Sequence, residues 1–180
     1  MNAAPSTSDQ VVLVNEHDLV IGTMDKLEAH QLGALHRAFS IFLFDPEGRL
    51  LLQQRAVNKY HSGSLWTNTC CSHPRPDESL SDAATRRLRE EMGMEATMDL
   101  RFSFLYKADV GGGLTEHELD HVLFGEVAID PSPNPEEVRD WRFIGIPELQ
   151  EEMANSPERF TIWLHKCWPM IAAELKERQA

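Results

Sequence analysis

The stretch Arg86-Arg87-Leu88-Arg89-Glu90-Glu91-Met92-Gly93 decides the fold of this chain. It ends a predicted helix over residues 81–92, in which apolar side chains recur at Ala84, Leu88 and Met92. Gly93 follows as a C-terminal cap, because glycine readily adopts the left-handed backbone that ends many helices. Arg86/Glu90 and Arg87/Glu91 form i, i+4 pairs of opposite charge. Such pairs are common on solvent-exposed helices, so they do not by themselves indicate a site.

Predicted strands lie on both sides of this helix in the sequence. Before it, the patterns predict strands over 11–15 and 19–23 as one hairpin, 38–44 and 50–54 as a second, and 65–69 as a single short strand. After it, they predict strands over 102–108 and 119–127 around a glycine loop, a helix over 147–154, and a last helix that starts at Ser156-Pro157 and is kinked or interrupted at Pro169. We therefore expect an α+β fold with one domain over residues 11–180, after a flexible tail over 1–10.

The composition excludes several classes of protein. No apolar run approaches the roughly 20 residues of a membrane helix, and the first ten residues lack the pattern of a signal peptide. Three cysteines in 180 residues predict free thiols in the cytoplasm rather than a disulfide framework. The net charge of −12 argues against a nucleic-acid partner. An anionic ligand must therefore be bound by a local cluster of Lys, Arg and metal.

A second informative stretch is Thr67-Asn68-Thr69-Cys70-Cys71-Ser72-His73-Pro74. Alternate residues of an extended segment share a face, so Cys71 and His73 can point into the same pocket. Metal or cationic side chains can lower the pKa of a thiol below about 8.5, so Cys71 is expected to be a usable base near neutral pH. The alternative is a chance Cys-x-His in a core strand.

Histidines and glutamates elsewhere suggest a metal site. Glu116 and Glu118 alternate along one predicted strand, so they share a face from which His117 is turned away. Imidazoles and carboxylates together suit a divalent ion of the Mg, Mn or Zn class. Each residue alone is as compatible with a surface position, and the hypothesis depends on the whole set. The candidate ligands are His30, His36, His73, Glu116 and Glu118.

The region around the helix resembles the Nudix pattern G-x5-E-x7-R-E-U-x-E-E-x-G-U, in which U is aliphatic. Glu78, Arg86, the pair Glu90-Glu91 and Gly93 occupy their places in this pattern. Ser72 replaces its first glycine, and Arg87 replaces the glutamate of its R-E pair. In Nudix hydrolases the box glutamates gather magnesium on a pyrophosphate. An arginine there is expected to hold a diphosphate rather than to help cut it.

From Val11 to Trp163 the chain resembles the type I isopentenyl-diphosphate isomerases, which have a Nudix fold. The resemblance lies in the stretches 35–40, 51–55 and 67–74, in the altered box and in Glu116-His117-Glu118. It implies a Nudix-like α/β/α sandwich with a mixed sheet. It implies the five metal ligands above, with Mn²⁺, Mg²⁺ or Zn²⁺, and a diphosphate-associated Mg²⁺ on Glu91. The other residues that it implies are catalytic Cys71, Glu118, Tyr106 and Trp163, and diphosphate-binding Lys26, Arg55, Lys59 and Arg87.

The implied activity is the conversion of isopentenyl diphosphate to dimethylallyl diphosphate. A metal-assisted acid, Glu118, would protonate the alkene and the Cys71 thiolate would remove a proton from C2. The face of Trp163 would stabilise the intermediate cation, and the C-terminal helix would act as a lid. Basic residues are accordingly expected only at the diphosphate end. Two alternatives are a Nudix hydrolase of a nucleoside or dinucleotide diphosphate, and a non-catalytic Nudix-like binding module.

Overall fold

A computed structural model describes residues 10–179 of the chain, with side chains up to Glu177. The first nine residues of the predicted tail lie outside this range, and Gln10 already begins a strand. The elements in chain order are β1 (Gln10–Val14), β2 (Val20–Asp25), α1 (Lys26–Leu32), β3 (His36–Phe44), β4 (Leu50–Arg55), β5 (Trp66–Thr67), β6 (Cys70–Ser72), α2 (Leu80–Met92), β7 (Met98–Gly111), β8 (Leu114–Glu126), β9 (Val138–Ile144), α3 (Ile146–Asn155), the 3-10 helix η2 (Pro157–Arg159) and α4 (Ile162–Gln179).

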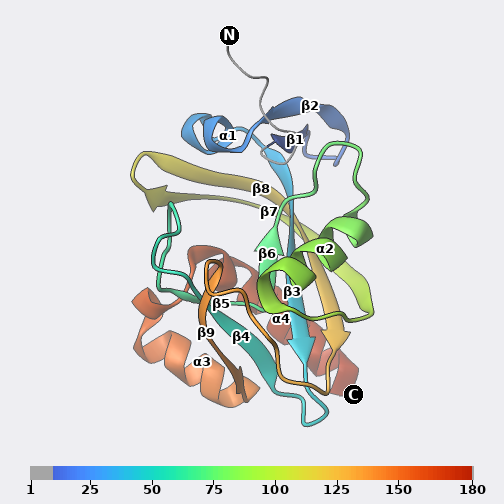
Figure 1. Ribbon diagram of the computed structural model, residues 1–180, viewed down its shortest axis with the longest axis vertical. Helices are drawn as coiled ribbons and strands as arrows, with labels where there is room; N and C mark the ends of the chain where they lie inside the picture. Colours follow the sequence, from blue (N-terminus) through green and yellow to red (C-terminus); the bar gives the residue numbers. More distant parts are fainter. Residues whose placement is uncertain (1–9, 180) are drawn as a thin grey trace.

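β3 is the central strand of the sheet because most of its side chains are apolar and all of its residues except Arg37 are buried. It pairs in parallel with β8 along its whole length, from His36 opposite Glu118 to Phe44 opposite Glu126. β6 pairs antiparallel with β3, with Ser40 opposite Cys71. The sheet is therefore mixed, as expected, and it places β6 and β8 beside the same central strand (Figure 1).

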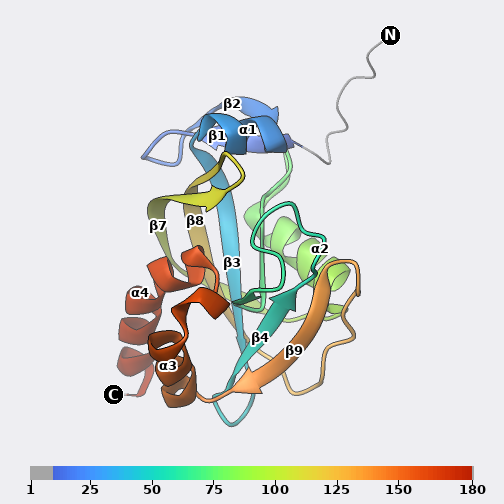
Figure 2. The ribbon, with the colours of Figure 1, turned by 90° about the vertical axis from the view of Figure 1, so that its left-hand side faces the viewer.

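Helices cover the two faces of the sheet, as Figure 2 shows with α2 on one side and α3 and α4 on the other. Phe39, Ile41 and Leu43 of β3 pack in a core cluster with Leu88 and Met92 of α2. The alternate residues of β3 belong to a second core cluster with α3 and α4, formed by Phe42, Phe44, Leu149, Leu164 and Trp168 among others. The expected α+β sandwich is confirmed, and the period of two along β3 explains how it is held together.

The helix α2 agrees closely with its prediction. Ser79 is its N-cap, with a side chain that accepts a hydrogen bond from the Asp82 amide at 3.1 Å. Gly93 caps the other end with a φ of 63°. A Cβ at Gly93 would lie 2.3 Å from the Ser132 carbonyl oxygen, so packing as well as backbone conformation requires glycine there.

Three predicted strands differ in the structure. The segment over 65–69 is not one strand, since β5 pairs with β4 whereas β6 pairs with β3. The second predicted hairpin exists only at its turn, where Phe44 lies opposite Leu50. Beyond that turn β4 leaves β3 and pairs with β9, a strand that the sequence patterns did not predict. Exposed charged residues within β9 hide its alternation.

The last helix does not start at Ser156-Pro157. Those residues lead into η2, and α4 begins at Ile162. The Phe160 and Thr161 backbone instead contacts β5: Thr161 N donates to the Trp66 carbonyl oxygen at 3.0 Å. Pro169 lies within α4 and does not interrupt it. The tertiary contact with β5 therefore overrides the local proline signal, and it brings Trp163 to the start of the helix.

Candidate active site

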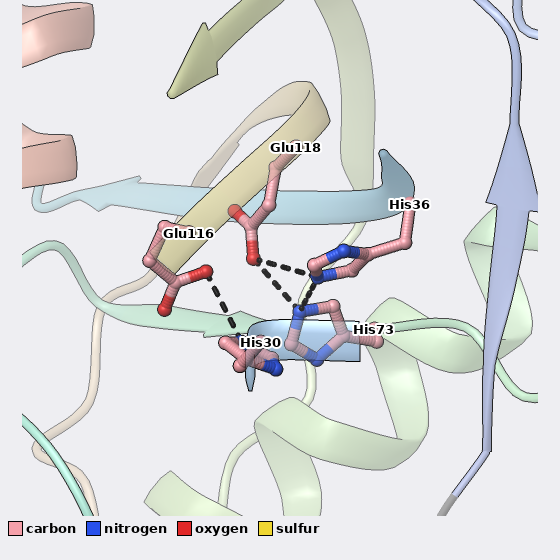
Figure 3. A group of neighbouring side chains, drawn as sticks. All are labelled: His30, His36, His73, Glu116 and Glu118. Carbon is pink, nitrogen blue, oxygen red and sulfur yellow. Dashed lines mark hydrogen bonds and ion pairs between the residues drawn. The ribbon is translucent and has the colours of Figure 1, made fainter. Parts of the chain in front are cut away.

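Five side chains from four parts of the chain meet at one end of the sheet (Figure 3). Their candidate ligand atoms all lie within 4.8 Å of one another. In the pairing of β3 with β8, His36 lies opposite Glu118. Glu116, two residues earlier in β8, lies on the same face as Glu118. These are the five predicted metal ligands, contributed by α1, β3, the segment after β6, and β8: His30, His36, His73, Glu116 and Glu118.

The helix α1, which the sequence patterns did not predict, carries His30. The Asp25 side chain accepts from the Glu28 amide at 3.1 Å to start this helix, and Gly33 ends it with a φ of 61°. Both caps are visible in the sequence, but seven residues are too few for a clear helical period. α1 lies beside β8, and His117 accordingly points away from the five ligands, with its Nδ1 at 2.9 Å from the Gly33 carbonyl oxygen.

Hydrogen bonds orient two of the imidazoles toward the cluster. Nδ1 of His30 lies 2.5 Å from the Lys26 carbonyl oxygen, and Nδ1 of His36 lies 2.8 Å from that of Ala34. Each Nδ1–H therefore donates to a carbonyl, which leaves Nε2 as the atom with a free lone pair. This arrangement is typical of histidines that bind metal through Nε2.

The atoms at the centre of the cluster are short of partners. Nε2 of His30 and Oε2 of Glu116 lie 3.2 Å apart, yet both are buried without a hydrogen bond. Nε2 of His36 and Nε2 of His73 face each other at 3.2 Å, and Oε1 of Glu118 lies 2.8 Å from His73 and 3.5 Å from His36. Lone pairs converging in this way suit a divalent cation, because unpaired buried polar atoms are otherwise costly. The cluster could hold such an ion.

Glu118 also belongs to a hydrogen-bonded pair across two strands. Tyr106 on β7 lies opposite it and donates its hydroxyl hydrogen to Oε2 at 2.7 Å. Burial raises the pKa of Glu118 to about 7, and the neighbouring Glu116 charge acts in the same direction. Glu116 has the opposite tendency: burial would raise its pKa, but the neighbouring His30 and His61 imidazoles hold that pKa well below its ordinary value. The two adjacent carboxyl groups are therefore chemically distinct.

One pocket opens next to this cluster and contains the other predicted residues. Cys71 of β6 and Glu118 of β8 come from strands that flank β3 on opposite sides, and both line the pocket. Of all the predicted site residues, only His30 and His36 lie behind the pocket wall, in contact with Glu116 and Glu118. The predicted residues along the wall are Lys26, Arg55, Lys59, Cys71, His73, Arg87, Glu91, Tyr106, Glu116, Glu118 and Trp163.

The adjacent cysteines have different surroundings. Cys70 is fully buried in the core cluster beneath α2, whereas Cys71 faces the pocket. The expected low pKa of Cys71 is not found. Burial raises the pKa of this thiol to about 12, although the Arg55 charge opposes the shift. Burial thus favours the neutral thiol, which is the opposite of the direction expected from the sequence.

Two of the basic side chains in the pocket wall are already paired with carboxylates. Arg87 forms ion pairs with Glu91 and, at 3.5 Å, with Glu137. Lys59 forms a short hydrogen bond with the same Glu137 carboxylate. Glu91 is also held by the Gln53 amide at 2.9 Å. Two of the four predicted diphosphate-binding side chains thus share one carboxylate that the sequence patterns did not single out.

The altered Nudix box keeps one of its internal contacts. Arg86 forms two hydrogen bonds with Glu78, Nε to Oε1 at 2.6 Å and Nη2 to Oε2 at 2.8 Å. Glu78 also accepts from the Arg75 amide at 2.9 Å. Arg86 and Glu78 therefore fix the loop before α2, and the replaced position, Arg87, is the one that turns toward the pocket.

Trp163 lies in the pocket wall in a fixed orientation. Its Nε1–H donates to Thr67 Oγ1 at 2.8 Å. The guanidinium carbon of Arg55 lies 5.1 Å from the centre of its ring. The sequence predicted basic residues only at the diphosphate end of the pocket. Arg55 instead lies against the ring of Trp163, so this prediction is wrong. One side of the indole is occupied by Arg55, so only the rest of its surface is available to a bound hydrocarbon.

Several residues that line the pocket or contact its basic side chains gave no clear signal in the sequence. Tyr60 and His61 lie in the segment between β4 and β5, whose irregular backbone has no period to read. Glu137 precedes β9, which was itself missed. His61 Nε2 lies 3.0 Å from Glu116 Oε1. The proximity of Lys59 to His61 in the sequence was the one signal that could have drawn attention to this segment.

Comparisons with known proteins agree with this geometry. The model of the NUDIX domain matches residues 34–164. An isopentenyl-diphosphate Delta-isomerase 2 of Aromatoleum aromaticum is 54% identical over 159 residues, which cover 88% of this chain and 84% of that protein. An isopentenyl-diphosphate Delta-isomerase of Serratia proteamaculans is 48% identical over 172 residues, 96% of each chain.

Solved structures share the fold at lower identity. A crystal structure from Deinococcus radiodurans superimposes with a TM-score of 0.68 at 18% identity, covering 82% of this chain and 90% of that one. A MutT protein from Methanosarcina mazei gives a TM-score of 0.64 at 17% identity, covering 79% and 96%. These likenesses establish the fold alone. Together with the matches in sequence, they show that the chain has a Nudix fold and belongs to the isopentenyl-diphosphate Delta-isomerase family.

Proposed function

We propose that this enzyme interconverts isopentenyl diphosphate and dimethylallyl diphosphate. One observation carries the proposal: a single pocket is lined by a neutral thiol, a tyrosine-linked carboxyl group, an indole and four cationic side chains. Proton transfer to and from a hydrocarbon needs acid–base groups in a dry site, and a diphosphate needs cations. The family to which the chain belongs carries this activity in its name.

The reaction adds one proton to the terminal carbon of the alkene and removes another from C2. The electron pair of the first double bond forms the new C–H bond, which leaves positive charge on C3. The electron pair of the C2–H bond then forms the new double bond, and the diphosphate is unchanged. We assign the two proton transfers to Cys71 and Glu118, which flank β3 on its two sides. Since the reaction is reversible, the group that donates in one direction accepts in the other.

Tyr106 and Trp163 support these transfers. The Tyr106 hydroxyl holds Oε2 of Glu118, so it orients the carboxyl group whichever form that group takes. Trp163, with 4% of its surface exposed, excludes water that would trap the cation and offers π electrons to stabilise it by about 2 kcal/mol when desolvated. Its position at the start of α4 supports a role in the wall of the closed site rather than requiring the whole helix to move.

The donor set suits a resident ion. His30, His36, His73, Glu116 and Glu118 would hold Mn²⁺, Mg²⁺ or Zn²⁺, and Glu91 would hold a Mg²⁺ that accompanies the diphosphate. When bound, such an ion supplies positive charge that lowers the pKa of an adjacent acid and balances buried carboxylates. The orphaned Nε2 of His30 and Oε2 of Glu116 are the features that support occupancy.

Lys26, Arg55, Lys59 and Arg87 line the same pocket and would bind the diphosphate there. Arg87 replaces a box glutamate, so a metal ligand of the hydrolases becomes a phosphate donor here. This substitution favours the isomerase over the hydrolase of nucleoside or dinucleotide diphosphates. The complete set of acid–base groups likewise argues against a non-catalytic binding module.

The cysteines support a location in the cytoplasm. Cys70, Cys71 and Cys167 are all free. Among residues 10–179, no helix has the length and apolar character needed to span a membrane.

The direct test is to incubate the purified, metal-loaded protein with isopentenyl diphosphate and Mg²⁺. Proton NMR should show the allylic product, and a parallel assay should show no phosphate or pyrophosphate release. Reaction in ²H₂O should place deuterium in the product, since protons exchange with the acid–base groups. Phosphate release without allylic product would contradict the proposal and favour the hydrolase, and neither product would favour the binding module.

A further inference from the structure

His61 is a buried histidine of the pocket wall to which the proposed reaction assigns no role. Its side chain comes from the irregular segment between β4 and β5, and 9% of the residue surface is exposed. Nε2 lies 3.0 Å from Oε1 of Glu116. His61 is not among the five residues whose ligand atoms converge. It therefore contacts a candidate metal ligand from outside the cluster.

The two oxygens of Glu116 have different partners. Oε2 faces Nε2 of His30 at 3.2 Å, and both atoms are buried without a hydrogen bond. Oε1 faces His61 instead. A carboxylate that binds an ion through one oxygen is commonly held through the other by a hydrogen-bond donor. The contacts of Glu116 divide between its oxygens in this way.

The partners of the two ring nitrogens suit a His61 tautomer with the proton on Nε2, because Nε2 faces a carboxylate oxygen that only accepts. Ser62 Oγ lies 3.1 Å from Nδ1 of His61, so the serine hydroxyl can donate to Nδ1. Nε2 then carries the hydrogen and donates it to Glu116.

Aromatic neighbours hold the imidazole ring in place. Tyr60 packs against it at an interplanar angle of 89°, with ring centres 4.4 Å apart. Trp163 packs at 88° and 5.9 Å. A donor that is locked by packing on two sides restricts the carboxylate it touches more than a mobile surface donor would.

We propose that His61 is a positioning residue, which donates Nε2–H to Oε1 of Glu116 and so directs Oε2 toward the metal. The inference rests on the proposed function in so far as the five converging residues hold an ion. It also links two parts of the site, since the same ring contacts the metal ligand and the wall residue Trp163.

Two substitutions separate the hydrogen bond from the packing. His61→Phe keeps a ring between Tyr60 and Trp163 but has no donor, whereas His61→Gln keeps an N–H donor near the position of Nε2 but has no ring. His17→Phe is the matched control, because His17 is exposed in the turn after β1. Mn²⁺ affinity is measured on metal-free protein by calorimetry, and the ion's surroundings by electron paramagnetic resonance.

We expect His61→Phe to weaken Mn²⁺ binding roughly 10- to 100-fold, as loss of a donor to a metal ligand does. His61→Gln should bind within about threefold of the wild type, with a similar resonance spectrum. His61→Ala also lacks the donor and places no volume in the wall. It should therefore weaken Mn²⁺ binding at least as much, and it replaces His61→Phe if that variant does not fold.

Unchanged affinity in the donor-free variants would overturn the inference. Equal losses in His61→Phe and His61→Gln would also overturn it, since an N–H donor at this position would then fail to restore Mn²⁺ binding. The isomerase assay of the wild type is scored separately. Absence of allylic product, with Mn²⁺ affinities in the expected order, would refute the proposed reaction and still support the role of His61. If the wild type turns over normally but His61→Phe binds Mn²⁺ as tightly as the wild type, only the positioning role of His61 is refuted.

Discussion

The two ends of the pocket differ in how their charges are balanced. At the histidine end, Nε2 of His30 and Oε2 of Glu116 are buried without a partner. At the basic end, Arg87 and Lys59 are already paired with Glu91 and Glu137. The histidine end is therefore incomplete without a cation, whereas two of the four cations at the basic end are already balanced before an anion arrives. This difference suits a resident ion at the histidine end, which must stay bound, and a diphosphate substrate at the basic end, which must be released after each turnover.

The largest expected effect is at Cys71, which lines the same pocket. Cys71→Ala should reduce turnover roughly 100- to 10,000-fold, because it removes one of the two proton-transfer groups. Metal content and unfolding temperature should not change. NMR measures the turnover, elemental analysis the metal content and a thermal melt the unfolding temperature.

Cys70→Ala is the matched control for that substitution. Cys70 is fully buried in the core beneath α2, so the change should cost about 1 kcal/mol of stability and little activity. The two cysteines have been assigned wrongly if Cys71→Ala turns over normally, or if an electrophilic epoxide analogue of the substrate labels Cys70 and spares Cys71.

His36→Ala tests the histidine end. It removes a candidate ligand whose Nδ1 is fixed by the Ala34 carbonyl, so divalent-metal affinity should fall by at least about 100-fold and activity should fall with it. Elemental analysis after dialysis gives the metal content. His17→Ala, at an exposed position, should retain both metal and turnover. Full metal content and full turnover in His36→Ala would rule out the proposed site.

Arg87→Ala tests the basic end, where binding rather than chemistry should suffer. The diphosphate does not change during the reaction, so KM should rise roughly 10- to 100-fold while kcat falls less. Arg89→Ala is the control on the same helix, because Arg89 is exposed and pairs only with Glu95 among the described residues. A fall in kcat with unchanged KM would place Arg87 in the chemistry and remove the distinction between the two ends.

The smallest expected effect is that of Glu137→Gln, which tests how the charges at the basic end are balanced. Its carboxylate competes with a diphosphate for Lys59 and Arg87, so removing the charge should strengthen Mg²⁺-pyrophosphate binding roughly fivefold, or about 1 kcal/mol. Calorimetry measures this affinity, with Glu136→Gln as the exposed neighbour that should behave as wild type. Weaker binding in Glu137→Gln would mean that the carboxylate positions the cations rather than competing for them.

Much of the fold could be predicted because its signals are local. The period of α2, its glycine cap and its Arg/Glu pairs all appear in the structure, as does the shared face of Glu116 and Glu118. α1 and β9 were missed, the first because seven residues show too little period and the second because charged residues obscure its alternation. The start of α4 was misplaced because the contact of Thr161 with β5 cannot be read from neighbouring residues.

The sequence by itself determined which residue types were available: a Nudix-like helix with arginine in place of a glutamate, a thiol beside His73, and the five metal-ligand candidates. Tertiary structure decided what these residues meet. Pairing of β6 and β8 with β3 brings Cys71 and Glu118 into one pocket, and burial there raises the pKa of the thiol. His61 reaches Glu116 and Glu137 reaches Arg87 only through long-range packing. Periodicity and capping depend on adjacent residues, whereas burial, pKa and side-chain partners depend on the whole fold.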